Sequence, residues 1–342
     1  MRHGAEPRMR GSDPKNPLRF GTSTMQWFEQ VIQVLLIGIT NGAIIRLVAL
    51  GYTLVYGIIE LINFAHGDVF MIGTMVSLTL LTWIPQMLGV RQAFQLPPLT
   101  IAALLVLCLV ASTAACGLLN VVIERVAYRR LRNAPRLAPL ISAIGVSFIL
   151  VNVGLVWKGA SQVNFPSLLP SVDILRDVFG INTLIQFRLK DLFVLVVAVP
   201  LMILLQTFVQ RTRLGKAMRA TAQDRQAASM MGIDINLTIA LTFLLGGALA
   251  GSAGLIYGLY NNSAWFFQGF RSGLYAFTAA VMGGIGNLQG AFMGGMLIGI
   301  IAAVSDSVFD PKWTEAVVFG LLVLILIFRP RGLLGEETTE RA

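Results

Sequence analysis

Charged residues are scarce in this 342-residue chain: they make up 13% of it, whereas 56% of the residues are hydrophobic. A soluble domain carries about 25% charged residues. The deficit excludes an ordinary soluble fold, and long uncharged apolar runs indicate helices that cross a lipid bilayer. Because these runs are apolar on every side, they do not fit the alternating strands of a membrane β-barrel.

Cysteine and histidine are also rare, with two residues of each type. Cys108 and Cys116 fall in one apolar segment, where we expect them to be packing residues. An intramembrane enzyme needs a nucleophile with a base, or a metal cluster, and two histidines give little scope for either. We therefore expect no catalytic residue, no metal and no cofactor.

A phosphate-binding loop of the type G-x4-G-K-[ST] is absent from the sequence as well. Gly215-Lys216-Ala217 lacks both the first glycine and the hydroxyl residue of that motif. Any ATP chemistry must therefore lie on another chain.

Apolar segments follow one another along most of the chain. They cover residues 31–59, 69–90, 99–123, 137–157, 192–210, 237–260, 272–305 and 316–328, the last extended upstream through Trp313. The 34 uncharged residues of 272–305 would form a helix of about 51 Å. The hydrocarbon core is only about 30 Å thick, so this run must turn and cross twice. The sequence predicts an all-α, polytopic helical bundle of eight or nine membrane segments.

The turn within 272–305 is visible as Gly283-Gly284-Ile285-Gly286-Asn287. Non-helical backbone at membrane depth persists only where protein or a water-filled cavity satisfies its polar groups. We expect Gly283, Gly284, Gly286 and Asn287 to line a water-filled pathway or to pack deep inside the protein.

The net charge of +9 is concentrated in short connections. Arginines gather at 125–136, arginines and a lysine at 211–225, and two arginines at 329–331. The positive-inside rule makes these three regions cytoplasmic and the connection between Trp157 and Asp191 external. This distribution indicates membrane topology, so we expect no nucleic-acid partner.

Both ends of the chain are polar. Residues 1–24 are interpreted as a disordered tail or as the product of a start codon placed too early, because their basic residues conflict with the external side predicted for them. We expect one transmembrane domain over residues 25–335, followed by a cytoplasmic tail at 336–342.

The connection 211–236 carries the most informative pattern. Its residues 216–231 favour a surface helix, which Gly232 is placed to end. Such a helix, parallel to the membrane, suits docking to a soluble partner. The candidate docking residues are Gly215, Lys216, Arg219, Ala220, Asp224, Gln226, Ala227, Ala228 and Gly232.

Gln226-Ala227-Ala228, followed after three residues by Gly232, resembles the Glu-Ala-Ala-x3-Gly coupling motif of ABC importer permeases, with glutamine in place of glutamate. Over residues 27–335 the chain resembles the permeases of branched-chain amino acid importers. This resemblance rests on the sequences at 50–57 (LGYTLVYG), 62–68 (INFAHGD), 213–220 (RLGKAMRA), 283–287 (GGIGN) and 328–333 (FRPRGL).

The resemblance implies an inner-membrane machine of several subunits. It predicts a second permease, two cytosolic ATPase subunits and an external solute-binding protein around this chain. The implied cargo is a branched-chain or other apolar amino acid, with urea or short amides as the alternative. A passive channel or secondary transporter is the alternative from another class. The absence of Asp, Glu and His from 69–90 and 237–305 counts against proton coupling, but not against a channel.

Two further features have unusual polarity. Asn63, His66 and Asp68 lie between two apolar segments, either as a solvated turn in which Asp68 stabilises the next helix N-terminus or beside the transport pathway. Arg46 lies near the middle of the first segment, where the resembling family usually has an uncharged residue. A charge there costs several kcal/mol unless it faces protein or water. It is a candidate pathway or subunit-contact residue, or a side chain that snorkels.

Overall fold

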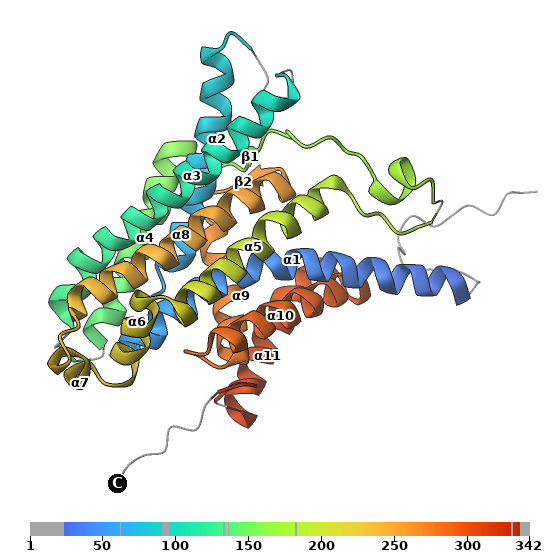
Figure 1. Ribbon diagram of the computed structural model, residues 1–342. Helices are drawn as coiled ribbons and strands as arrows, with labels where there is room; N and C mark the ends of the chain where they lie inside the picture. Colours follow the sequence, from blue (N-terminus) through green and yellow to red (C-terminus); the bar gives the residue numbers. More distant parts are fainter. Residues whose placement is uncertain are drawn as a thin grey trace, which may run out of the picture.

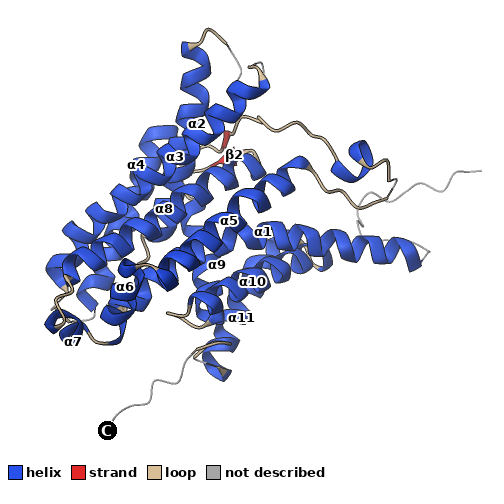
Figure 2. Ribbon diagram, in the orientation of Figure 1, coloured by secondary structure: helices blue, strands red, loops and turns tan. Residues whose placement is uncertain are grey.

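The computed structural model describes residues 24–61, 63–90, 96–132, 134–135, 137–181, 183–329 and 331–335 (Figure 1). The predictions for the N-terminal tail and for 336–342 concern residues that lie outside these ranges, apart from Thr24. Helices dominate the fold (Figure 2). They are α1 (Thr24–Ile59), α2 (His66–Met87), α3 (Pro98–Ile123), α4 (Leu137–Lys158), α5 (Leu189–Arg211), α6 (Arg213–Gln223), α7 (Arg225–Met230), α8 (Ile235–Asn261), α9 (Gln268–Gly283), α10 (Leu288–Val308) and α11 (Thr314–Phe328).

Short elements complete the described chain. A π-helical turn at Glu124–Tyr128 and a 3-10 turn at Arg129–Leu131 extend α3, a π-helical turn covers Ile174–Val178, and a 3-10 turn at Pro311–Trp313 precedes α11. The strands β1 (Val163–Asn164) and β2 (Ser263–Ala264) pair antiparallel.

Eight helices within the described ranges are long and apolar enough to cross a membrane. They are α1, α2, the extended α3, α4, α5, α8, α10 and α11 with its preceding 3-10 turn. The predicted all-α polytopic bundle is confirmed. The run 272–305 is broken as predicted, because Gly284 and Gly286 take φ values of +109° and +93° between α9 and α10. With 16 residues, α9 is only about 24 Å long, which is short for a full crossing.

The basic connections meet at one end of the bundle. Arg132 in the extension of α3 donates to Asn236 at 2.8 Å, and Arg225 donates to the carbonyl of Ile58 at the end of α1 at 2.8 Å. At the same end of α1, Gly57 lies against Gly286 in the turn between α9 and α10. The positive-inside rule makes this the cytoplasmic end.

The opposite, external end gathers the remaining connections. β1 and β2 join the connection after α4 to the one after α8. Near the start of α1, Glu29 and Gln33 accept hydrogen bonds from the backbone of Leu184 and Gln186. The first described turns of α1 therefore lie beside the connection that the charge pattern makes external.

Glycines bring the helix backbones into close contact. A Cβ atom added to Gly299 of α10 would lie 2.5 Å from the carbonyl oxygen of Gly38 in α1, and one added to Gly73 of α2 would lie 2.7 Å from the Cα atom of Gly251 in α8. Lipid offers no hydrophobic driving force between helices, so such close packing stabilises the bundle. The more peripheral α4 and α11 turn large apolar side chains outward.

Candidate functional site

The segment between α5 and α8, which the charge pattern predicts to be cytoplasmic, folds as two short helices. Thr212 caps α6 by accepting a hydrogen bond from the backbone of Gly215 at 3.0 Å. Asp224 then takes an extended conformation and caps α7, accepting from the backbone N–H groups of Gln226 and Ala227 at 2.8 and 3.0 Å. The prediction of one helix over 216–231 is therefore wrong. The Asp224 carboxylate satisfies the first N–H groups of α7, so the chain can break and change direction there.

The predicted end of this segment at Gly232 is confirmed. Gly232 has φ +81° and its N–H donates to Ser229, while the N–H of Ile233 donates to Ala228. This pair of hydrogen bonds is the Schellman motif, which needs a residue in the left-handed region. A Cβ atom at Gly232 would meet nothing within 4 Å, so only the backbone conformation favours glycine.

One face of α6 and α7 holds the segment against the bundle. Gly215, Met218, Thr221 and Ala228 are buried on that face. A side chain at Gly215 would collide with the end of α5, since its Cβ atom would lie 2.6 Å from the carbonyl oxygen of Phe208. Together with the bond from Arg225 to Ile58, these contacts connect the segment to both α5 and α1.

The other face is open to solvent. Of the predicted docking residues, Lys216, Arg219, Asp224, Gln226, Ala227 and Gly232 are exposed, Ala220 is half-buried, and Gly215 and Ala228 are buried. Met230 and Met231 at its tip are 87% and 82% exposed, and neither was among the predicted docking residues. Large exposed apolar side chains in a polar segment are typical of interaction surfaces, so both methionines are candidate site residues, and their consecutive positions in the connection were the available signal.

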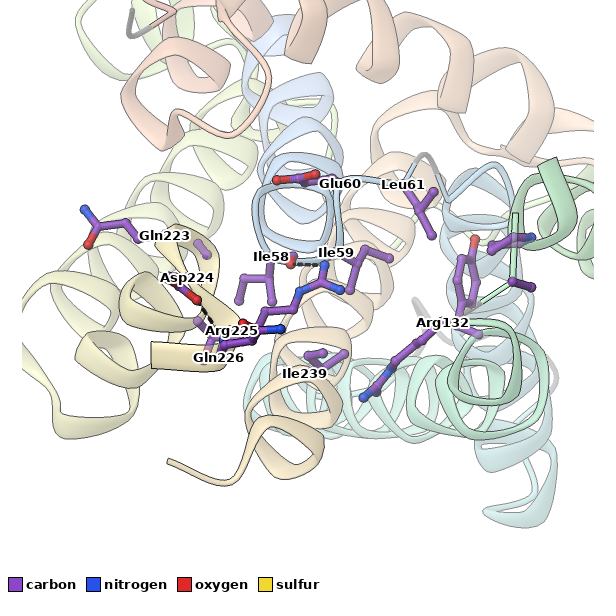
Figure 3. Close-up of a pocket in the computed structure, with 15 residues that line it drawn as sticks. Ile58, Ile59, Glu60, Leu61, Arg132, Gln223, Asp224, Arg225, Gln226 and Ile239 are labelled. Atoms are coloured by element: carbon purple, nitrogen blue, oxygen red, sulfur yellow. Dashed lines mark hydrogen bonds between the residues drawn. The ribbon is translucent and has the colours of Figure 1, made fainter. Parts of the chain in front are cut away.

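A cavity of about 370 Å³ lies behind this segment (Figure 3). Figure 3 shows Arg225 reaching toward the end of α1 and Arg132 coming from the opposite side. Arg132 pairs with the fully buried Glu124. Burial lowers the pKa of Arg132, an effect that the neighbouring Glu124 carboxylate opposes. The cavity is lined by Ile58, Ile59, Glu60, Leu61, Tyr128, Arg132, Ala134, Pro139, Thr221, Ala222, Gln223, Asp224, Arg225, Gln226 and Ile239.

Asn63, His66 and Asp68 form a buried group, so the turn is not solvated, although Asp68 does lie in the first turn of α2 as predicted. α2 begins at His66, and the three residues are at most 2% exposed. Asp68 accepts from Ser147 of α4 at 2.5 Å, and makes no side-chain cap on α2. Asn63 accepts from Tyr128 at 3.1 Å. Within the described ranges, no group of three or more His, Cys, Asp or Glu side chains could hold a metal.

The turn between α9 and α10 is packed against the C-terminal segment. Asn287 caps α10 and its side-chain amide donates to the carbonyl of Leu334 at 2.8 Å. The N–H groups of Leu333 and Leu334 donate to Met282 and Gly283. Gly283 and Gly284 are buried, whereas Gly286 is exposed. This turn and the α6–α7 segment thus both contact the last residues of α1.

Arg46 lies at the contact between α1 and α10, and its residue is 5% exposed. Its guanidinium carbon is 4.4 Å from the centre of the Phe292 ring, and Nη2 contacts the sulfur of Met296. The side chain therefore faces protein, as predicted for a charge that must face either protein or water.

The bundle, with eight helices in the described ranges that are able to cross a membrane, is that of a polytopic membrane protein. Residues 34–326 match the family described as "Branched-chain amino acid transport system / permease component", and the chain belongs to this family. It is a multi-pass membrane protein, of the inner membrane in bacteria, and serves as the membrane-spanning subunit of a transporter.

Curated relatives resemble the chain over most of its length. It is 40% identical over 316 residues to the high-affinity branched-chain amino acid transport system permease protein BraD of Pseudomonas aeruginosa, covering 91% of this chain and 97% of that one. It is 38% identical over 314 residues to permease protein LivH of the corresponding Escherichia coli K12 system, covering 92% and 98%. The probable branched-chain amino acid transport permease protein LivM of Methanocaldococcus jannaschii is 29% identical over 140 residues, covering 37% and 41%. No solved structure matches the chain.

Proposed function

We propose that the chain is a permease subunit of an ABC importer that carries a branched-chain or other apolar amino acid. The relatives' names support an amino acid cargo over urea or short amides. Two kinds of permease, LivH and LivM, carry such names among the relatives, which supports pairing of this chain with a second, related permease. A solute-binding protein would deliver the cargo at the external end.

The observation that carries the proposal is the α6–α7 segment, with Met230 and Met231 exposed at its tip and basic residues on its outer face. Exposed methionines beside lysine and arginine suit a partner surface with an apolar groove and acidic rim. We assign this partner as two cytosolic ATPase subunits, one for each permease. ATP hydrolysis belongs to them, and the present chain performs no covalent chemistry.

The segment's inner contacts provide a route for force. Arg225 of α7 holds the end of α1, and Thr212 joins α6 directly to α5. A displacement of the docked segment would therefore tilt α1 and α5 against the rest of the bundle. Alternating access needs such a two-state element, because a cargo moves only if the pathway opens on one side at a time.

Gly232→Val tests the docking assignment. A β-branched residue at φ +81° costs about 1–2 kcal/mol, so the native segment should be disfavoured and its ATPase affinity should fall about 5- to 30-fold. Gly232→Asn is the matched control, because asparagine tolerates this conformation and the site has space for it. The amount of ATPase recovered with the affinity-tagged permease from detergent-solubilised membranes measures the effect, alongside uptake of labelled leucine.

Met230→Asp and Met231→Asp examine the same surface without backbone strain. Both should lower ATPase recovery while leaving membrane abundance unchanged. If Gly232→Val and both methionine variants retain the ATPase and full uptake, the docking assignment is wrong. If uptake persists when no ATPase is associated at all, the chain is a passive channel instead.

A further inference from the structure

Arg46 carries a charge that the described residues leave unneutralised. Its guanidinium contacts a thioether and an aromatic face, and its Nε has no hydrogen-bond partner. None of the ion pairs within the described ranges involves Arg46. A cation buried at membrane depth without an anion costs several kcal/mol, so this position calls for an anionic partner.

Helix α10 is shaped to accommodate this side chain. A Cβ atom at Gly295 would lie 2.8 Å from the Cα atom of Arg46 and would also collide with its Cγ. The missing side chain lets the stem of Arg46 pass α10 and brings the guanidinium beside Phe292, which is 37% exposed. The charge thus lies between α1 and α10, over the face of the Phe292 ring.

The neighbouring surface is apolar. Phe292 also lines a narrow gap between α1, α5 and α10 together with Leu50, Met202, Leu205, Gln206 and Leu288. One fixed cation beside aliphatic and aromatic side chains fits a small carboxylate with an aliphatic chain. The gap measures only about 10 Å³, so this conformation holds no amino acid there.

Helix α5 forms one wall of the gap, and the chain passes from α5 through Thr212 directly into α6. A displacement of α6 against the bundle would therefore change the separation of α5 from α1 and α10. The gap would widen in one state beside Phe292, whose ring Arg46 contacts, and close in the other.

We propose that Arg46 binds the carboxylate of the transported molecule at the contact of α1, α5 and α10, with the aliphatic part of that molecule against Phe292 and Met202. The carboxylate site follows from the unpaired charge and its surroundings. That the carboxylate belongs to an amino acid rests on the proposed function.

Thermal unfolding of the detergent-purified membrane complex, without soluble binding protein, tests the site directly. Four probes separate the chemistry: leucine, isovalerate (carboxylate without amine), isopentylamine (amine without carboxylate) and leucinamide. For the wild type we expect leucine and isovalerate to raise the unfolding temperature and the two compounds without a carboxylate to leave it unchanged. Equal shifts for isovalerate and isopentylamine, or no shift with either carboxylate, would overturn the proposal.

Arg46→Met removes the charge while keeping an unbranched apolar stem, and Arg46→Lys keeps the charge without the planar fork. We expect half-saturation by isovalerate to weaken more than about tenfold in Arg46→Met and less in Arg46→Lys. Arg271→Met is the control, because Arg271 is exposed and already paired with Glu315. An unchanged response in Arg46→Met overturns the assignment.

A subunit-contact role for Arg46 has its own signature. In that case Arg46→Met would lower recovery of the second permease while the remaining complex still responded to isovalerate, and this result would also overturn the proposal. Leucine uptake by intact cells is measured separately. If isovalerate binding depends on Arg46 but cells do not import leucine through this transporter, the proposal of an amino acid cargo is refuted, whereas the proposal of a carboxylate site at Arg46 is supported.

Discussion

Replacement of Arg132 by alanine should destabilise this permease more than replacement of its partner. Glu124 is fully buried at the end of α3, and one of its carboxylate oxygens accepts from Arg132 while the other has no partner. The Arg132 side chain is 16% exposed and also bonds to Asn236. Glu124 therefore needs Arg132 to compensate its buried charge, whereas Arg132 also has solvent and Asn236.

The magnitudes follow from what each variant leaves behind. Arg132→Ala leaves a buried carboxylate without a cation, which should lower the free energy of unfolding by about 3–5 kcal/mol. Glu124→Gln removes the buried charge and leaves an arginine that reaches solvent and Asn236, so its cost should be about 1 kcal/mol. The double variant should lie near the milder single variant, which corresponds to a coupling energy of about 3–5 kcal/mol.

Unfolding by sodium dodecyl sulfate in mixed micelles measures these differences on the purified protein. Arg129→Ala is the matched control, because Arg129 is exposed in the same connection and its loss should cost less than about 0.5 kcal/mol. Equal destabilisation by the two single variants would refute the reasoning. So would a double variant whose cost is the sum of the two.

Two further variants test packing and coupling. Gly299→Val should lower the free energy of unfolding by about 1–3 kcal/mol and reduce membrane abundance, because the new Cβ would lie 2.5 Å from the Gly38 oxygen. Gly320→Val on α11 is the control in the same unfolding assay, because a Cβ there meets nothing within 4 Å and the variant should be neutral. Arg225→Ala removes the bond to the Ile58 carbonyl, so the ATPase should still bind while uptake per ATP hydrolysed falls; a normal ratio in that variant would show that α7 transmits no motion through Arg225.

Sequence alone determined the features of this protein that depend on local chemistry. Uncharged runs defined the membrane helices, because a charge in the bilayer is costly wherever the helix packs. Clustered arginines placed three connections at one end, and the bonds from Arg132 to Asn236 and from Arg225 to the end of α1 agree with that topology. Gly232 and the Gly284–Gly286 turn were predictable because a positive φ favours glycine in any fold.

The break at Asp224 also depends on the local sequence, but the strong helix formers on both sides of it favoured the prediction of one continuous helix. An aspartate can either continue a helix or cap the next one, and its hydrogen bonds to Gln226 and Ala227 decide between these states. Helix propensity alone favoured a continuous helix, whereas the structure has the Asp224 cap at the start of α7.

Tertiary structure decided the rest, because partners distant in sequence supply the missing half of each interaction. Polarity suggested a solvated turn at Asn63–Asp68, but Tyr128 and Ser147 arrive from other elements and satisfy part of it inside the bundle. No pattern around Arg46 revealed that Gly295 and Phe292, some 250 residues away, would shelter its charge. The sequence could show that this arginine is costly, but only the packing of α1 on α10 shows where its charge is presented.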